Sequence, residues 1–238
     1  MHLLAFETAT EACSVALWID GAVRERFEIA PRRHAELSLP WAEALLDEAG
    51  IAKSQLDAIA VGRGPGAFTG VRLAVALAQG IALALDRPVV PVSTLAALAM
   101  RAGEDAPHIL AAIDARMGEV YSAAFAREGE DLRALSAETV SAPGVVELPD
   151  DGMQLQGMQW RGVGTGFAAA ERALETRLHA RLASVDAAAL PHAADVARLG
   201  AIAFARGEAL PPERLEPAYL RNQVALTLEQ QQALRASR

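Results

Sequence analysis

The sequence LAFETA at residues 4–9 is matched later in the chain by AAIDAR at residues 111–116. Both are short apolar runs that end on an acid, Glu7 in the first and Asp114 in the second, and both lead through a turn into a β-hairpin pattern. The same order of strands and helices follows each of them, which is typical of an internal duplication. We therefore predict an α/β fold of two related lobes, each of the form β-β-β-α-β-α.

The elements around these two runs follow from apolar periodicity and from turn residues. In the first lobe we expect strands at residues 3–7, 13–19, 22–29, 57–61 and 88–92, and helices at 34–48 and 69–85. In the second lobe we expect strands at 109–114, 120–126, 132–140 and 160–164, and helices at 143–148, 167–178 and 192–206. The predicted divisions of the chain are a lobe at 1–105, a lobe at 106–225, a loop at 149–159 and a polar tail at 226–238.

Composition and charge indicate a folded protein and argue against a disordered, a membrane-spanning and a nucleic-acid-binding chain. The chain has 238 residues, 52% of them hydrophobic and 22% charged, so it can bury a core and is not mainly disordered. Its net charge of −8 argues against binding of nucleic acid by this chain alone. No run reaches the roughly 18 apolar residues that cross a bilayer, and the amino terminus lacks a basic segment. We therefore expect a cytoplasmic protein without a membrane partner, and the single cysteine, Cys13, excludes an intramolecular disulfide.

Glu7 and Asp114 are candidates for nucleotide binding because each ends the opening strand of its lobe. In a two-lobed fold, the turns after such strands can present backbone N–H groups to phosphates while the acid holds magnesium through water. The alternative is that both acids tie down a hairpin, which is favoured because the first lobe carries the longer glutamate and its turn has no glycine. Gly164, in a glycine-rich strand-to-helix turn, is a third candidate, for a base or ribose, with a plain tight turn as its alternative.

The remaining motifs argue against catalysis. The sequence GRGPGAFTGVR at residues 62–72 is not a dinucleotide fingerprint, because Ala67 takes the place of the third glycine and Pro65 removes a backbone N–H. We interpret it as a rigid turn from a strand into a helix. The five histidines are far apart in the sequence and form no H-x-x-x-H pair, and no G-x-S-x-G elbow is present. We expect no catalytic residue and no metal site in this chain.

The predicted helix at residues 69–85 is apolar on nearly all sides. Such a helix either lies inside a core or turns one face toward a partner, and its small residues permit a close approach to another helix. The candidate interface residues are the apolar side chains of this helix and of the helix before it. They are Trp41, Leu45, Val71, Val75, Ala78 and Ala82.

Four blocks of sequence resemble the TsaB family, also called YeaZ, in the family's order. They lie at residues 6–17, 62–72, 112–121 and 216–221. The resemblance implies an actin-like fold (ASKHA, ribonuclease H-like) of two duplicated lobes. It also implies a role in forming N6-threonylcarbamoyladenosine on the tRNA adenosine 3′ of the anticodon, in tRNAs that read codons beginning with A. In that system the catalytic paralogue TsaD transfers the threonylcarbamoyl group, and TsaE, an ATPase, joins TsaD and TsaB.

The resemblance also implies that this chain is not the catalytic subunit. TsaD carries a metal-binding His-x-x-x-His after the strand that corresponds to residues 89–92, and its two histidines fall at about Thr94 and Leu98 here. We therefore expect an accessory subunit that docks on TsaD through the helices at 33–49 and 69–85, so that Val75→Glu abolishes binding and leaves the fold intact. tRNA would be contacted only through the complex, where ATP and magnesium act, and the chain alone would form a weak homodimer. The chain itself requires no cofactor, and weak binding of a nucleotide stays open.

Two other functions remain open for the same fold. One is a stand-alone ATP-dependent phosphotransferase, which needs a carboxylate base and a magnesium site at Asp114. The other is a glycopeptidase-like hydrolase, which the missing histidine pair and the lack of a nucleophile oppose.

Overall fold

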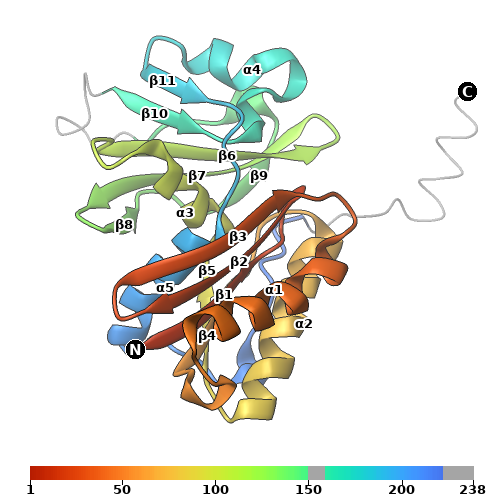
Figure 1. The fold of residues 1–238 in the computed structure, drawn as a ribbon. Helices are drawn as coiled ribbons and strands as arrows, with labels where there is room; N and C mark the ends of the chain where they lie inside the picture. The colour runs from red at the N-terminus through yellow and green to blue at the C-terminus, as the bar shows by residue number, and fades with distance from the viewer. Residues whose placement is uncertain (150–158, 222–238) are drawn as a thin grey trace, which may run out of the picture.

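The computed structural model describes residues 1–149 and 159–221. Two β-sheets, one in each lobe, form the centre of the molecule, and helices cover them (Figure 1). Short 3₁₀ turns lie at Lys53–Gln55, Met100–Ala102, Pro143–Val145, Thr165–Phe167 and Pro212–Arg214.

The first sheet has five strands in the order β3-β2-β1-β4-β5. Their bounds are β1 His2–Glu7, β2 Ala12–Ile19, β3 Ala22–Ile29, β4 Ala58–Gly62 and β5 Val89–Val92. The first three are antiparallel, whereas β4 runs parallel to β1 and β5 runs parallel to β4. In this register Leu4 lies opposite Leu17 on one side and Ile59 on the other.

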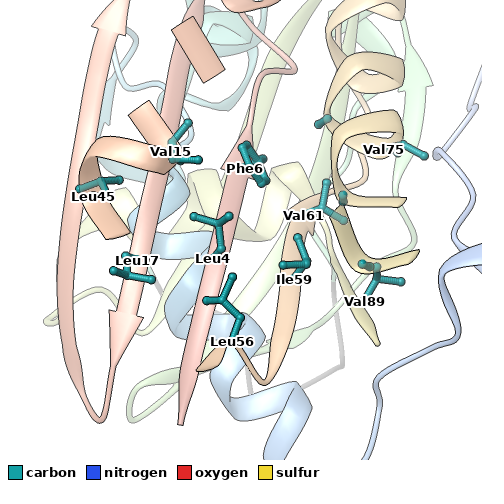
Figure 2. Packing of buried hydrophobic residues seen from close by; sticks show 14 of the residues in the cluster. Leu4, Phe6, Val15, Leu17, Leu45, Leu56, Ile59, Val61, Val75 and Val89 are labelled. Carbon is teal, nitrogen blue, oxygen red and sulfur yellow. The ribbon is translucent and has the colours of Figure 1, made fainter. Parts of the chain in front are cut away.

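Helices bury both faces of the first sheet. The helices α1 (His34–Ala49) and α2 (Phe68–Leu85) pack against one face, where Leu4 and Phe6 belong to a buried cluster (Figure 2). Side chains alternate along a strand, so Leu3 and Ala5 point to the other face, which α5 (Ala193–Ala205) covers. Burial on both faces explains why β1 is a continuous apolar run rather than an alternating one.

The second sheet repeats the first. Its strands are β6 His108–Arg116, β7 Glu119–Glu128, β8 Asp131–Ala134, β10 Trp160–Val163 and β11 Leu182–Asp186. Read from β8, their order is β8-β7-β6-β10-β11, the counterpart of β3-β2-β1-β4-β5, and the additional strand β9 (Thr139–Ser141) pairs with β7. The predicted α/β fold of two duplicated lobes is confirmed, in agreement with the actin-like fold.

Each half of the chain supplies one helix to the lobe formed by the other half. The helix α3 (Thr94–Ala99) follows β5 but packs into the core of the second sheet, where Leu95 and Leu98 contact residues of β6 and β7. In the same way α5 follows β11 but covers the first sheet, while α4 (Ala169–Leu178) covers the face of the second sheet opposite α3. The predicted division at 1–105 and 106–225 therefore needs a correction, because residues 193–205 pack on the first sheet and residues 94–99 pack on the second.

Several local predictions were wrong. The single strand expected at 132–140 is two strands, β8 and β9, because the Ser136 hydroxyl takes the place of a ladder partner and accepts a hydrogen bond from Ala124 N (2.9 Å). The helix expected at 143–148 is only a 3₁₀ turn, since Gly144 and two valines disfavour a longer helix. The helix α3 and the strand β11 were not predicted. The loop at 149–159 lies almost wholly outside the described residues, and the tail at 226–238 lies entirely outside them.

The prediction that no apolar segment is long enough to cross a bilayer needs a correction, because α2 has 18 residues. Within the described residues it is the one helix that is long and apolar enough to cross a membrane by length and composition alone. This is weak evidence, because the core helix of a globular protein has the same properties, and one side of α2 packs on the first sheet through Ala74, Val75, Ala78 and Ala82.

Candidate functional site

Glu7 lies at the end of β1 and is fully buried. Its carboxylate accepts hydrogen bonds from Ala9 N (2.7 Å) and from the Thr94 hydroxyl (2.9 Å). Burial raises the pKa of this carboxyl to about 7, although both hydrogen bonds lower it. A Cβ atom added to Gly62 would clash with the carboxylate, so glycine is required beside it. Glu7 therefore joins β1, β4 and α3 inside the protein and does not present its charge to a ligand.

Stability should depend on pH through Glu7. Its pKa lies near 7 in the folded chain and near 4.5 in the unfolded chain, so the folded state binds the additional proton between these values. The free energy of unfolding is expected to fall as pH rises from 4.5 to 7, by up to about 3 kcal/mol. Urea unfolding at several pH values should show this slope in the wild type and not in Glu7→Gln.

The control for this prediction is Glu11→Gln, at an exposed position four residues further along the chain. It should keep the slope of the wild type. Parallel pH profiles for Glu7→Gln and the wild type would show that Glu7 does not titrate in this range.

Asp114 and Gly164, the other two candidates for nucleotide binding, both hold the backbone of a turn in place. The Asp114 carboxylate accepts hydrogen bonds from Arg116 N (2.7 Å) and from the Arg116 guanidinium (2.9 Å), so it closes its own turn. Gly164 has a φ of 107°, and a Cβ there would clash with the carbonyl of Ala112 in β6. The structure favours the alternative for all three candidates, in which they hold turns and hairpins in place.

The positions that correspond to the histidine pair lie one turn apart on α3. Thr94 and Leu98 are both fully buried, and the Thr94 hydroxyl bonds Glu7 and accepts from Gly64 N (3.2 Å). Neither side chain can hold a divalent metal in the way that a histidine does. Over residues 1–149 and 159–221, no three His, Cys, Asp or Glu side chains are grouped so that they could hold a metal ion.

A cavity of about 740 Å³ lies between the two lobes. Its walls come from six places in the sequence: the turn after β1, the residues around the start of α1, the start of α2, the β6–β7 hairpin, Thr165 after β10 and the segment 218–221. Four arginines line it, Arg32, Arg72, Arg116 and Arg221, together with the two carboxylates of Glu11 and Asp114. The predictions from sequence missed this cavity, although all four blocks that resemble the family contribute to it.

The segment at residues 215–221 joins the lobes beside this cavity. Ala218 N donates to Arg63 O (2.8 Å), and the Arg72 Nε donates to the Tyr219 hydroxyl (2.6 Å), which binds the segment to the first lobe. Arg221 donates to Ala115 O (3.1 Å) in the β6–β7 hairpin and pairs with Glu119 in the same hairpin. The start of α2 is thereby connected to the second lobe.

The predicted interface residues lie mostly in the core. Leu45, Val75, Ala78 and Ala82 are buried in the cluster that α1 and α2 form with the first sheet, and Figure 2 labels Leu45 and Val75 there. Val71 is also buried, and Trp41 is partly exposed. The expected effect of Val75→Glu is therefore wrong, because a glutamate at this position would place a charge in the core and unfold the lobe.

The other side of α2 is apolar and largely exposed, with Leu73 and Leu77 half-buried at its edge. We define the α2 outer face as Leu73, Ala76, Leu77, Gly80, Leu83 and Ala84. Leu83 is 63% exposed, and a Cβ atom added to Gly80 would touch nothing. A continuous apolar and small-residue surface on one helix is typical of a contact with another protein.

Comparison with known proteins identifies the family. A family model described as "TsaD: tRNA N6-adenosine threonylcarbamoyltransferase" matches residues 27–227. The chain is 42% identical over 229 residues to the tRNA threonylcarbamoyladenosine biosynthesis protein TsaB of Escherichia coli K12, which covers 94% of this chain and 96% of that protein. The chain belongs to the TsaB (YeaZ) family.

Further relatives agree with this membership. The TsaB protein of Haemophilus influenzae is 39% identical over 234 residues, covering 94% of this chain and 95% of that protein. The solved structure of YeaZ from Pseudomonas aeruginosa superposes with a TM-score of 0.82 at 45% identity and covers 92% of this chain and 99% of that chain. The resemblance seen in the four sequence blocks is thus confirmed over nearly the whole chain.

Proposed function

We propose that this chain is an accessory subunit that binds TsaD through the α2 outer face and activates it for transfer of threonylcarbamoyl to tRNA. The observation that carries the proposal is the match to the TsaD family model together with the burial of Thr94 and Leu98, where the resemblance places the metal-binding histidines of TsaD. A subunit of this fold without a metal site can still provide a binding surface for a partner protein. The α2 outer face is an apolar surface of this kind.

The rest of the assembly follows from the same proposal. TsaE joins the pair, tRNA is bound by the complex rather than by this acidic chain, and the assembly works in the cytoplasm. In the absence of TsaD, the α2 outer faces of two copies associate weakly, because each apolar face is then exposed to solvent. ATP and magnesium act in the complex, and this chain needs no cofactor of its own.

Reconstitution tests the proposal. The purified chain is mixed with its cognate TsaD, TsaE, unmodified tRNA, ATP and threonylcarbamoyl-adenylate, and the modified nucleoside is measured with each protein left out in turn. Product should form only when both this chain and TsaD are present. Product from this chain without TsaD, or full activity of TsaD without this chain, would contradict the accessory role.

A further inference from the structure

We infer that ion pairs on two sides of the boundary between the lobes hold the lobes at one fixed angle, so that this chain is a rigid scaffold and does not open and close. One group of ion pairs, on the α2 side, involves residues at the start of α2 and in the segment 215–221. The other group, on the α5 side, involves residues of α5 and the residue after it. The inference goes beyond the proposed function and does not depend on where TsaD docks.

Two ion pairs cross the boundary on the α2 side. Arg63, between β4 and α2, binds Glu138 of the second lobe through two contacts, from Nη1 to Oε2 (3.1 Å) and from Nη2 to Oε1 (3.2 Å). Arg221 pairs with Glu119 in β7 and donates to Ala115 O (3.1 Å) in β6. The segment that carries Arg221 is itself bonded to the first turns of α2. A pair with two contacts, such as that of Arg63, fixes the orientation of the two lobes as well as their distance.

Two further ion pairs cross the boundary on the α5 side. The carboxylate of Asp195 in α5 accepts a hydrogen bond from Arg101 Nη1 (3.3 Å), in the 3₁₀ turn directly after α3. Arg206, the residue that follows α5, pairs with Asp131 at the start of β8. Because α5 packs on the first sheet, whereas α3 and β8 belong to the second lobe, both pairs join the lobes.

Burial separates these contacts from ordinary surface ion pairs. An ion pair that is fully exposed to water contributes little to stability, because water and salt screen it. The side chains of Glu138 and Asp195 are only 16% and 4% exposed, so each carboxylate depends on its arginine partners for the charge interaction that water would otherwise supply. One such carboxylate lies on the α2 side and one on the α5 side.

The placement of the ion pairs on two sides is what excludes a hinge motion. The helices α2 and α5 cover opposite faces of the first sheet (Figure 1). A rotation of the lobes that closes the boundary on one side opens it on the other. Opening the α2 side separates Arg63 from Glu138, and opening the α5 side separates Arg101 from Asp195. Either direction of motion therefore breaks an ion pair with a largely buried carboxylate.

Double electron–electron resonance on the full chain tests the inference. Nitroxide labels are attached at Asp47→Cys in α1 and Thr176→Cys in α4, which are exposed positions in different lobes, and the native Cys13 is buried. The labelled chain should give one narrow distribution of distances. Combining Arg63→Gln with Arg101→Gln removes one ion pair on each side and should replace this distribution by a broad one.

The matched control combines Arg33→Gln with Arg133→Gln, two arginines whose ion pairs each lie within a single lobe. It removes the same charge and should keep the narrow distribution. Three results would overturn the inference: a broad distribution in the labelled wild type, a narrow one in Arg63→Gln with Arg101→Gln, or equal broadening in the control.

A second variant keeps the test valid if circular dichroism shows that Arg63→Gln with Arg101→Gln does not fold. Arg206→Gln with Arg101→Gln should fold, because Arg206 is largely exposed and Asp195 keeps Arg198 as a partner (2.7 Å). This variant releases the α5 side alone and should also broaden the distribution. An unchanged distribution would contradict the inference. None of these results bears on TsaD docking, which reconstitution measures separately.

Discussion

Replacing Gly80 by glutamate is expected to abolish association with TsaD while making the chain alone slightly more stable. Gly80 lies on the α2 outer face, and a Cβ atom added there has no other atom within 4 Å. Glutamate favours a helix over glycine by about 0.5 to 1 kcal/mol, so the fold should gain stability. Burying the new carboxylate in an apolar interface without a partner should weaken binding by at least about a hundredfold. Calorimetry with purified TsaD and thermal unfolding of the free chain measure the two effects.

The control is Gly80→Ala, which changes the helix propensity in the same direction but leaves the α2 outer face apolar and small. It should bind TsaD with nearly the affinity of the wild type. Unchanged binding by Gly80→Glu would mean that TsaD docks elsewhere. If the wild type instead floated with phospholipid vesicles and Gly80→Glu did not, the uncovered face would serve a membrane rather than a protein.

Gly70→Ala should have the largest effect on stability of any single methyl group added to α2. The new Cβ would clash with the carbonyl oxygen of Thr8, and backbone on both sides leaves nothing flexible to move away. The Thr8 hydroxyl also donates to Gly70 O (2.7 Å) inside the core, so a shift of either segment breaks a buried hydrogen bond. Overpacking and the broken bond together should lower the free energy of unfolding by about 3 kcal/mol or more.

Urea unfolding provides the measurement, and Gly80→Ala is again the matched comparison. It is the same substitution ten residues further along the same helix, in open space, and it should raise stability by up to about 1 kcal/mol. Equal effects of the two variants would show that the contact between Gly70 and Thr8 is not close in solution.

Features that are encoded locally in the chain could be predicted from the sequence, and features that depend on distant elements could not. The duplication could be predicted because Glu7 ends β1 and Asp114 lies near the end of the equivalent strand β6, and the same order of strands then follows in both halves. The orientation of α2 could not, since both of its sides are apolar and only the position of the sheet decides that Val75 points inward. The capping serine before α3, whose hydroxyl accepts from Ala96 N (3.1 Å), was a signal that could have located that helix.

The candidate sites were harder to predict than the fold. Glu7 is conspicuous in the sequence, but its burial depends on Thr94 and Gly62, which lie in other elements. The cavity is assembled from Arg32, Arg72, Tyr219 and residues of the second lobe, and no short motif contains more than a part of it. Periodicity describes one element at a time, so it says little about surfaces that form only when distant elements meet.

The exchange of helices between the lobes has a consequence for synthesis on the ribosome. Leu3, Ala5, Ala60 and Val90 are all translated early, yet the helix that covers them is α5, and Leu215, which completes the cluster on the opposite face, comes later still. The second sheet, in contrast, receives α3 from residues already made when its own strands emerge. The amino-terminal lobe is therefore the first to be translated and the last to be completed, and a chain released before residue 193 would leave one face of its first sheet bare.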